Sequence, residues 1–209
     1  MLHNEVLTVK AKELFEYLSA FQKDFYLAGG TGLALQIGHR ASVDFDLFSD
    51  TSIKKTLLNR VESVFSNYLV KVLINNEKEL TVTVADVKFT FLHYPFTPVL
   101  PFEVTAKPIN ILSLKEILAT KAYTLGRRGE YKDYVDMYTG LHEGVSTLTE
   151  IVELARKKYG DFFNDRLFLE QLLYLDDVEK VDLIMIERPV PSKGELLDLF
   201  SEKISELKV

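Results

Sequence analysis

The hydrophobic pattern changes partway along the chain, and this change limits the possible folds more than any other feature. Up to residue 92, short runs rich in Val, Leu and Phe are interspersed with helical segments. Beyond residue 113 the apolar residues recur at every third or fourth position, which is typical of helices. The chain therefore divides into a half that contains strands and a half that is helical.

The expected elements follow the order helix, strand, helix, strand, helix and three strands, and then helices alone. Helices are predicted near 8–21, 31–38, 53–65, 114–125, 131–142, 148–158, 164–175 and 193–207. Strands are predicted near 25–28, 43–47, 69–74, 80–84 and 87–92, the last three as an antiparallel meander. Two capping boxes, Ser113 with Glu116 and Thr147 with Glu150, mark helix starts.

This order favours an α+β fold in which a small mixed sheet with flanking helices precedes a helical C-terminal domain. Only one short strand–helix–strand unit occurs, so a doubly wound parallel sheet is disfavoured. Four prolines between residues 95 and 108 punctuate the stretch where extended chain crosses between the two parts. We therefore place the domains at 1–110 and 111–209.

The composition narrows the classes of protein further. The 209 residues are enough for one large domain or two small ones, and 47% are hydrophobic, so a packed core is expected. The sequence has no cysteine, which excludes disulfides, thiolate zinc sites and thiol nucleophiles and favours the cytoplasm. No apolar run approaches the ~20 residues that span a bilayer, so no targeting segment and no membrane partner are expected.

The most informative stretch runs from Phe25 to Asp46. It combines a buried strand, the Gly29-Gly30-Thr31 turn, a short helix, Gly-His-Arg, a serine, and a strand with paired acids. Residues two apart on a strand share a face about 6–7 Å apart, so Asp44 and Asp46 converge. Their repulsion of roughly 2 kcal/mol would be reversed by a divalent cation. Hard Mg²⁺ takes carboxylate and phosphate oxygens, so the acids predict a metal site.

The glycines next to the acids indicate a site for a phosphate group. Backbone N–H groups of Gly29 and Gly30 can approach an anion, and the following helix N-terminus favours negative charge. Thr31 can cap that helix, and Ser42 lies beside the acids. Just past the helix, the sequence places two further phosphate donors, His39 and Arg40. A phosphate-bearing ligand would thus be held from two sides.

A second cluster is basic, in a chain whose net charge of −6 gives no general attraction to nucleic acid. On a continuous helix Lys121, Arg128 and Lys132 would fall within about 20° of one direction. The three residues align only if Gly126 and Gly129 do not break that helix. Lys121 is the best phosphate ligand of the three, and Asp133 and Asp136 share a helix face as supporting acids or as partners of Arg128 or Lys132.

Other interpretations fit fewer of these residues. An isolated Asp-x-Asp pair is usually a solvated strand face. The glycines match neither a dinucleotide-binding fingerprint, because Leu35 stands where Gly or Ala is needed, nor a P-loop. A haloacid-dehalogenase-like phosphatase also uses Asp-x-Asp, but here Phe48 stands where that class usually has Thr or Val. A nucleotide-binding or partner-binding module without catalysis remains an alternative.

The residues resemble the AbiEii/AbiGii-type toxin family of nucleotidyltransferase-fold proteins, from about residue 8 to 177. The similarity rests on successive motifs in the same order: Gly-Gly-Thr-x-Leu-Ala-Leu at 29–35, Gly-His-Arg-x-Ser-x-Asp-x-Asp at 38–46, and Lys121 followed by Lys132-Asp133-x-x-Asp136. The resemblance implies a polymerase-β-like core, Mg²⁺ or Mn²⁺, and a nucleoside triphosphate. It also implies transfer to RNA, notably tRNA 3′ ends, and a cognate antitoxin that is often a DNA-binding protein.

Under this resemblance Asp44, Asp46 and Lys121 are the candidate catalytic residues, with the two aspartates as metal ligands. The candidate nucleotide-binding residues are Gly29, Gly30, Thr31, His39, Arg40, Ser42 and Lys132. Nucleotidyltransferases of this fold commonly have a third carboxylate on a later strand, but residues 87–92 contain no acid. Either Asp86 or Asp133 reaches the site, or two acids suffice, or the chain binds nucleotide without efficient transfer.

Overall fold

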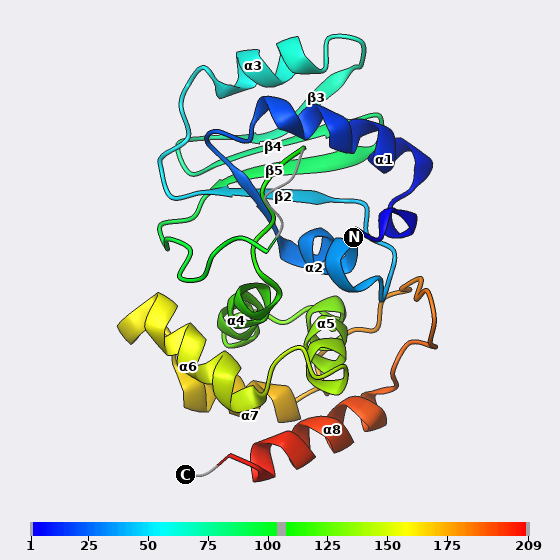
Figure 1. The fold of residues 1–209 in the computed structure, drawn as a ribbon, viewed down its shortest axis with the longest axis vertical. Helices are drawn as coiled ribbons and strands as arrows, with labels where there is room; N and C mark the ends of the chain where they lie inside the picture. Colours follow the sequence, from blue (N-terminus) through cyan, green and yellow to red (C-terminus); the bar gives the residue numbers. More distant parts are fainter. Residues whose placement is uncertain (1, 104–107, 208–209) are drawn as a thin grey trace. The chain divides into compact units, whose positions relative to one another are not determined.

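The computed structural model describes residues 2–103 and 108–207, and the chain divides into two compact units. The first unit contains Met1–Thr97 and Pro101–Ser113, and the second contains Pro98–Leu100 and Leu114–Val209. All strands of the described residues belong to the first unit (Figure 1). Residues 104–107 of the predicted extended crossing lie outside the described residues.

A five-stranded sheet forms the first unit, in the order β1-β2-β5-β4-β3. The meander of β3, β4 and β5 is antiparallel, as predicted, whereas β2 runs parallel to β5 and antiparallel to β1. This mixed sheet confirms the predicted α+β class and differs from the parallel strand–helix units that a phosphatase of the haloacid dehalogenase type would need. The strands are β1 (Tyr26–Ala28), β2 (Phe45–Ser49), β3 (Val70–Asn75), β4 (Glu79–Val84) and β5 (Val87–His93).

The two edges of the sheet differ. At β1, the N–H of Leu27 donates to the carbonyl of Asn110 and the carbonyl of Leu27 accepts from Leu112, each at 2.9 Å. At the opposite edge lies β3, where a register shift between Val72 and Ile74 gives Leu73 no partner in β4. The chain thus returns along β1 just before it enters the second unit.

Helices cover both sides of this sheet. Figure 1 shows α1 (Val9–Phe15) and α3 (Leu57–Val64) on one side and α2 (Gly29–Ile37) on the other. The helix predicted over 8–21 is instead α1 followed by a 3₁₀ segment, Glu16–Ala20, and a short 3₁₀ turn, Asn4–Val6, precedes it. Helix α3 begins four residues later than predicted. These differences shorten the helices but keep the predicted order.

Burial of Phe45 fixes the orientation of β2. Its side chain is fully buried, stacked on Phe15 with ring centroids 5.8 Å apart and packed on Phe89 at 5.1 Å. Side chains alternate along a strand, so this contact directs Asp44 and Asp46 to the opposite face. Both aspartates are partly buried there. The aromatic core therefore sets the position of the acid pair.

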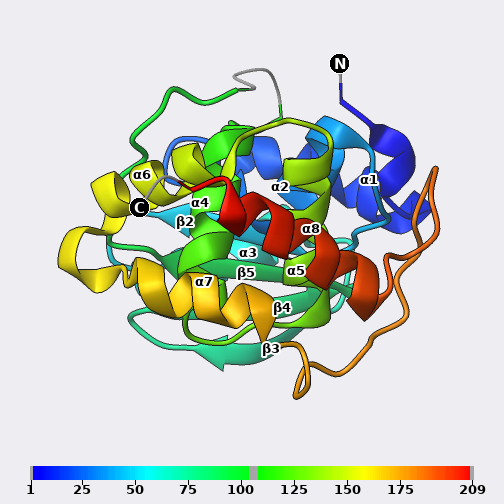
Figure 2. The same ribbon diagram turned by 90° about the horizontal axis from the view of Figure 1, so that it is seen from below.

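The second unit consists of helices. They are α4 (Leu114–Leu125), α5 (Tyr131–His142), α6 (Leu148–Tyr159), α7 (Asp165–Leu173) and α8 (Lys193–Ser205), and a 3₁₀ turn, Gly160–Phe162, follows α6. Helix α4 packs against α5, α6 and α7, and α8 packs against α5 and α7 (Figure 2). The predictions for 114–125 and 131–142 are confirmed to the residue. None of the helices within the described ranges is long and apolar enough to cross a membrane.

A buried ion pair replaces the capping box predicted for Ser113 and Glu116. The Glu116 carboxylate accepts the N–H groups of Val99 and Leu100 at 2.8 and 2.9 Å and binds Lys158 at 2.5 Å, with both charged side chains fully buried. The Ser113 hydroxyl is buried without a hydrogen-bond partner among the described residues. The prediction was wrong because Glu116 serves as a buried counter-ion.

Replacing Lys158 should destabilise the second unit strongly. Lys158→Met leaves the Glu116 carboxylate buried without its cation, so we expect the free energy of unfolding to fall by about 3–5 kcal/mol. Urea unfolding followed by circular dichroism measures this loss. The double variant Glu116→Gln/Lys158→Met removes both charges and should recover part of it, and equal destabilisation of single and double variants would contradict the explanation.

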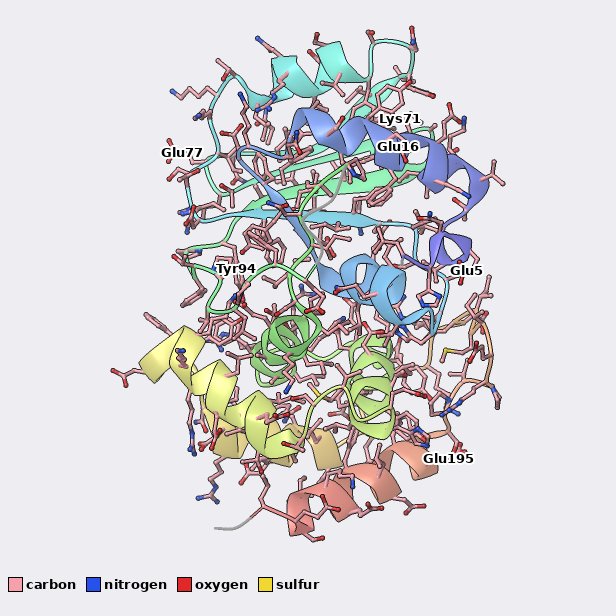
Figure 3. The ribbon with its side chains drawn as sticks, viewed as in Figure 1. Glu5, Glu16, Lys71, Glu77, Tyr94 and Glu195 are labelled. Atoms are coloured by element: carbon pink, nitrogen blue, oxygen red, sulfur yellow. The ribbon has the colours of Figure 1, made fainter. Side chains whose placement is uncertain are left out.

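The second predicted capping box forms. The hydroxyl of Thr147 accepts the N–H of Glu150 at 3.2 Å, and the Glu150 carboxylate accepts the N–H of Thr147 at 3.0 Å. Glu150 also accepts a 2.8 Å hydrogen bond from the ammonium of Lys115, and these partners lower its pKa to about 2. Ser192 and Glu195 form the same motif at the start of α8, where Figure 3 labels Glu195.

This cap should make stability depend on pH. The pKa of Glu150 is about 2 in the folded chain, below its ordinary 4.5, so its stabilisation is present above pH 4.5 and is lost as pH falls from 4.5 to 2. Glu150→Gln should lower the free energy of unfolding by about 1 kcal/mol at pH 7 and by much less near pH 2. Denaturant unfolding at several pH values tests this, with exposed Glu153→Gln on the same helix as control.

Candidate active site

The diglycine turn places α2 directly against the paired acids. Helix α2 begins at Gly29 with Ala28 as its N-cap. Thr31 therefore lies inside the first turn, and the prediction that it caps the helix was wrong. Gly29 has a φ of +64°, and a Cβ atom there would lie 2.2 Å from Oδ2 of Asp46. Both the backbone conformation and the approach of the carboxylate require glycine at this position.

Two hydroxyl groups fix the segment that leads into β2. Oγ1 of Thr31 lies 2.7 Å from Oγ of Ser42 and donates to the backbone carbonyl of Asp44. Thr31 is buried and Ser42 is partly buried. These hydroxyls join α2 to the residues just before the acids, and their contact with a nucleotide stays a prediction.

The acid pair lies at the start of β2, which begins at Phe45 rather than at the predicted Val43. Asp44 precedes the strand and Asp46 lies within it, paired in register with Ala28 of β1. Oδ2 of Asp44 is 2.9 Å from Nζ of Lys88 on β5, and the two side chains are 37% and 41% exposed. Asp44 thus reaches solvent beside a lysine that the sequence analysis did not select.

The donor set fits a single divalent cation. Asp44 and Asp46 supply carboxylate oxygens, and Mg²⁺ in nucleotide sites is usually bound by one or two carboxylates plus phosphates. Because Gly29 has no side chain, the carboxylate of Asp46 can lie against the start of α2. Within residues 2–103 and 108–207, no cluster of three or more Asp, Glu or His side chains could hold a metal ion.

Strand β5 shows why a third acid is missing. Thr90 pairs in register with Asp46, and Lys88 lies two residues earlier on the same face of β5. Asp86, proposed as one source of the third carboxylate, is exposed in the turn between β4 and β5 with a φ of +65°. The strand next to the acids therefore presents a lysine and a threonine.

The two predicted donors after α2 are buried. His39 is 8% exposed and Arg40 is 4% exposed, and Nη1 of Arg40 donates to the carbonyl of Ala41 at 3.1 Å. Gly38 ends α2 with a φ of +71°. The predicted position just past the helix is confirmed, whereas contact of either side chain with a phosphate stays a prediction.

In the second unit, Lys121 joins two acids from α5. Its ammonium lies 2.6 Å from Oδ1 of Asp133 and 2.7 Å from Oδ2 of Asp136, and the three side chains are at most 9% exposed. The other oxygen of Asp133 accepts the N–H of Glu130 at 3.2 Å and helps to start α5. The candidate acids thus meet Lys121 rather than Arg128 or Lys132.

The basic stripe on one continuous helix does not form, because α4 ends at Leu125 and α5 begins at Tyr131. Lys132 binds Glu130 at 2.9 Å and Arg128 binds the same carboxylate at 3.3 Å, and Arg128 and Glu130 are exposed. The Lys132 ammonium lowers the pKa of Glu130 despite partial desolvation. Lys132 therefore has a carboxylate partner already, and its role in nucleotide binding stays a prediction.

The chain matches one protein-family model and is similar to several known proteins. The family model described as "Nucleotidyl transferase AbiEii toxin, Type IV TA system" matches residues 13–195. An uncharacterised protein of Aquifex aeolicus, aq_aa25, is 29% identical over 185 residues, covering 88% of this chain and 87% of its own length. Solved structures that are similar to this chain include MenT4 and JHP933. MenT4, a nucleotidyltransferase toxin from Mycobacterium tuberculosis, has a TM-score of 0.60 at 18% identity, with 95% of this chain and 85% of MenT4 covered. JHP933 from Helicobacter pylori has a TM-score of 0.48 at 15% identity, with 96% of each chain covered.

Substituting Gly29 should damage the acid pair as well as the turn. Gly29→Ala combines an unfavourable φ with a clash against the Asp46 carboxylate, so it should cost more than the about 1 kcal/mol typical of a left-handed backbone position. Gly144→Ala is a matched control, because Gly144 has a φ of +67° and nothing lies within 4 Å of its added Cβ. Thermal unfolding of both variants measures the difference, and equal losses would contradict a specific contact with Asp46.

Proposed function

The chain belongs to the AbiEii family of nucleotidyltransferase toxins, and we propose that it transfers a nucleoside monophosphate from a nucleoside triphosphate to an acceptor hydroxyl with the help of Mg²⁺. The observation that carries this proposal is the approach of Asp46 to Gly29, with Asp44 on the same strand face. The carboxylate of Asp46 lies at the start of α2, where backbone N–H groups favour phosphate, and in this proposal Asp44 adds a second hard oxygen donor.

In this proposal Asp44 and Asp46 would hold the divalent ion, which supplies charge neutralisation to the reacting phosphates. Gly29 and Gly30 allow the backbone of α2 to approach the triphosphate. Thr31, through its hydrogen bonds to Ser42 and Asp44, keeps the first aspartate in place relative to this helix. The protein contributes positioning and electrostatics rather than a covalent intermediate.

The proposed step is one displacement at phosphorus. The acceptor oxygen forms a bond to the α-phosphorus while the bond from that phosphorus to the bridging oxygen of pyrophosphate breaks. Pyrophosphate leaves with that electron pair, and the proton of the acceptor hydroxyl passes to water. Lys121 is proposed as a phosphate-binding residue, with Asp133 and Asp136 holding its ammonium in place.

The proposed acceptor is RNA, in particular a tRNA 3′ end, and the proposed setting is a cytoplasmic toxin–antitoxin pair. The family description, a toxin of a type IV toxin–antitoxin system, supports the antitoxin partner. His39, Arg40 and Lys132 are proposed as further contacts to the nucleotide. Family membership favours transfer over a binding module without catalysis, and the small mixed sheet does not favour the phosphatase.

Transfer should depend on both aspartates. With α-labelled nucleoside triphosphate, Mg²⁺ and a tRNA pool, the wild-type chain should label RNA. Asp44→Asn and Asp46→Asn should each reduce labelling by roughly a hundredfold or more, because removing one charge-stabilising group at a reacting phosphate costs several kcal/mol. Lys121→Met should also reduce labelling.

Asp86→Asn is the matched control, because Asp86 is an exposed acid in the turn before β5. Circular dichroism should show that each variant is folded. Equal labelling by wild type and Asp44→Asn would contradict the catalytic assignment. Release of inorganic phosphate without transfer would favour the phosphatase, and nucleotide-dependent thermal stabilisation without labelling would favour a binding module.

A further inference from the structure

Lys88 occupies a position in the acid site that the proposed function leaves unexplained. We propose that the ammonium of Lys88 is a counter-cation of Asp44 that stays beside the acid pair when one divalent ion binds and takes the role of a second, so that the site binds one divalent ion only. Lys88 is on this view a positioning residue for Asp44. The inference rests on the proposed metal-binding role of Asp44 and Asp46.

The register of the sheet carries the first step of the argument. Strands β2 and β5 are parallel neighbours, with Phe45 beside Phe89 and Asp46 beside Thr90. Both phenylalanines are fully buried on the core side, so Lys88 emerges with Asp44 and Asp46 on the opposite face. A carboxylate that completed a two-ion site from this strand would have to stand at Lys88 or Thr90.

The contact between Lys88 and Asp44 carries the second step. Nζ of Lys88 lies 2.9 Å from Oδ2 of Asp44, so it uses an oxygen that a metal ion would also use. An exposed lysine–carboxylate pair is weak on its own, so a divalent ion can displace it. Because Lys88 and Asp44 are 41% and 37% exposed, the ammonium has room to move aside and stay nearby.

Charge accounts for the single ion. Asp44 and Asp46 carry two negative charges, which one divalent cation neutralises. Lys88 then adds one positive charge, which suits a triphosphate. A second divalent ion would lie close to this ammonium, and the described residues offer no cluster with a third carboxylate to offset the repulsion. The ammonium thus supplies part of the charge that a second ion supplies in two-metal sites.

Binding of Mn²⁺ alone to the full chain tests this inference without measuring activity. Free Mn²⁺ is followed by electron paramagnetic resonance for wild type, Lys88→Met, Lys88→Glu and the control Lys55→Met, an exposed lysine before α3. Wild type should bind one ion that Asp44→Asn/Asp46→Asn loses. Lys88→Met should bind that ion roughly twofold to fivefold more tightly, because the competing cation is gone. Lys88→Glu should bind a second ion.

The outcomes separate this inference from the proposed function. If wild type binds Mn²⁺ through the two aspartates but Lys88→Met and Lys88→Glu behave like Lys55→Met, the role of Lys88 is overturned and the metal site stands. If wild type shows two ions that depend on the aspartates, the single-ion inference is also overturned. If wild type binds no Mn²⁺ through them, both fail. Thermal unfolding in the absence of metal verifies that each variant is folded.

Discussion

The burial of Phe45 is the constraint on which the candidate site depends. A strand has only two faces. Because Phe45 is packed against Phe15 and Phe89 on one face, the side chains of Asp44 and Asp46 must point to the other. The glycine at the start of α2 then lets the second aspartate settle against the helix. A shift of one residue in the register of β2 would bury both carboxylates in the aromatic core. Correct pairing of β2 is therefore enough to place the two aspartates.

Much of this arrangement follows from the sequence alone. Alternation in 43–47 and 87–92 is a local property of the chain, and it predicts which side chains share a face. The contact of Lys88 with Asp44 could not be predicted, because it depends on the parallel pairing of β2 with β5 across about forty intervening residues. The start of α2 was missed for a different reason: Gly29 adopts a positive φ that lets the helix begin before Thr31.

The second unit shows how tertiary contacts override local motifs. Glu116 has the spacing of a capping residue, yet a fully buried lysine on α6 and two backbone N–H groups bind it instead. Lys121 was likewise expected in a basic stripe, but the chain breaks between α4 and α5, and α5 packs against α4 with two acids on Lys121. Charges that the sequence places on a surface are here part of the interior, where each one needs its partner.

One edge of the sheet, strand β3, is left open to pairing with strands of other molecules. Along β3, Val72, Leu73 and Ile74 are 44%, 58% and 40% exposed, which is the composition of a strand that recruits further strands. The extra residue Leu73 distorts the ladder, and Lys71 adds a charge to this strand (Figure 3). A bulge and a lysine are devices by which natural sheets blunt an exposed edge, and β3 carries one of each.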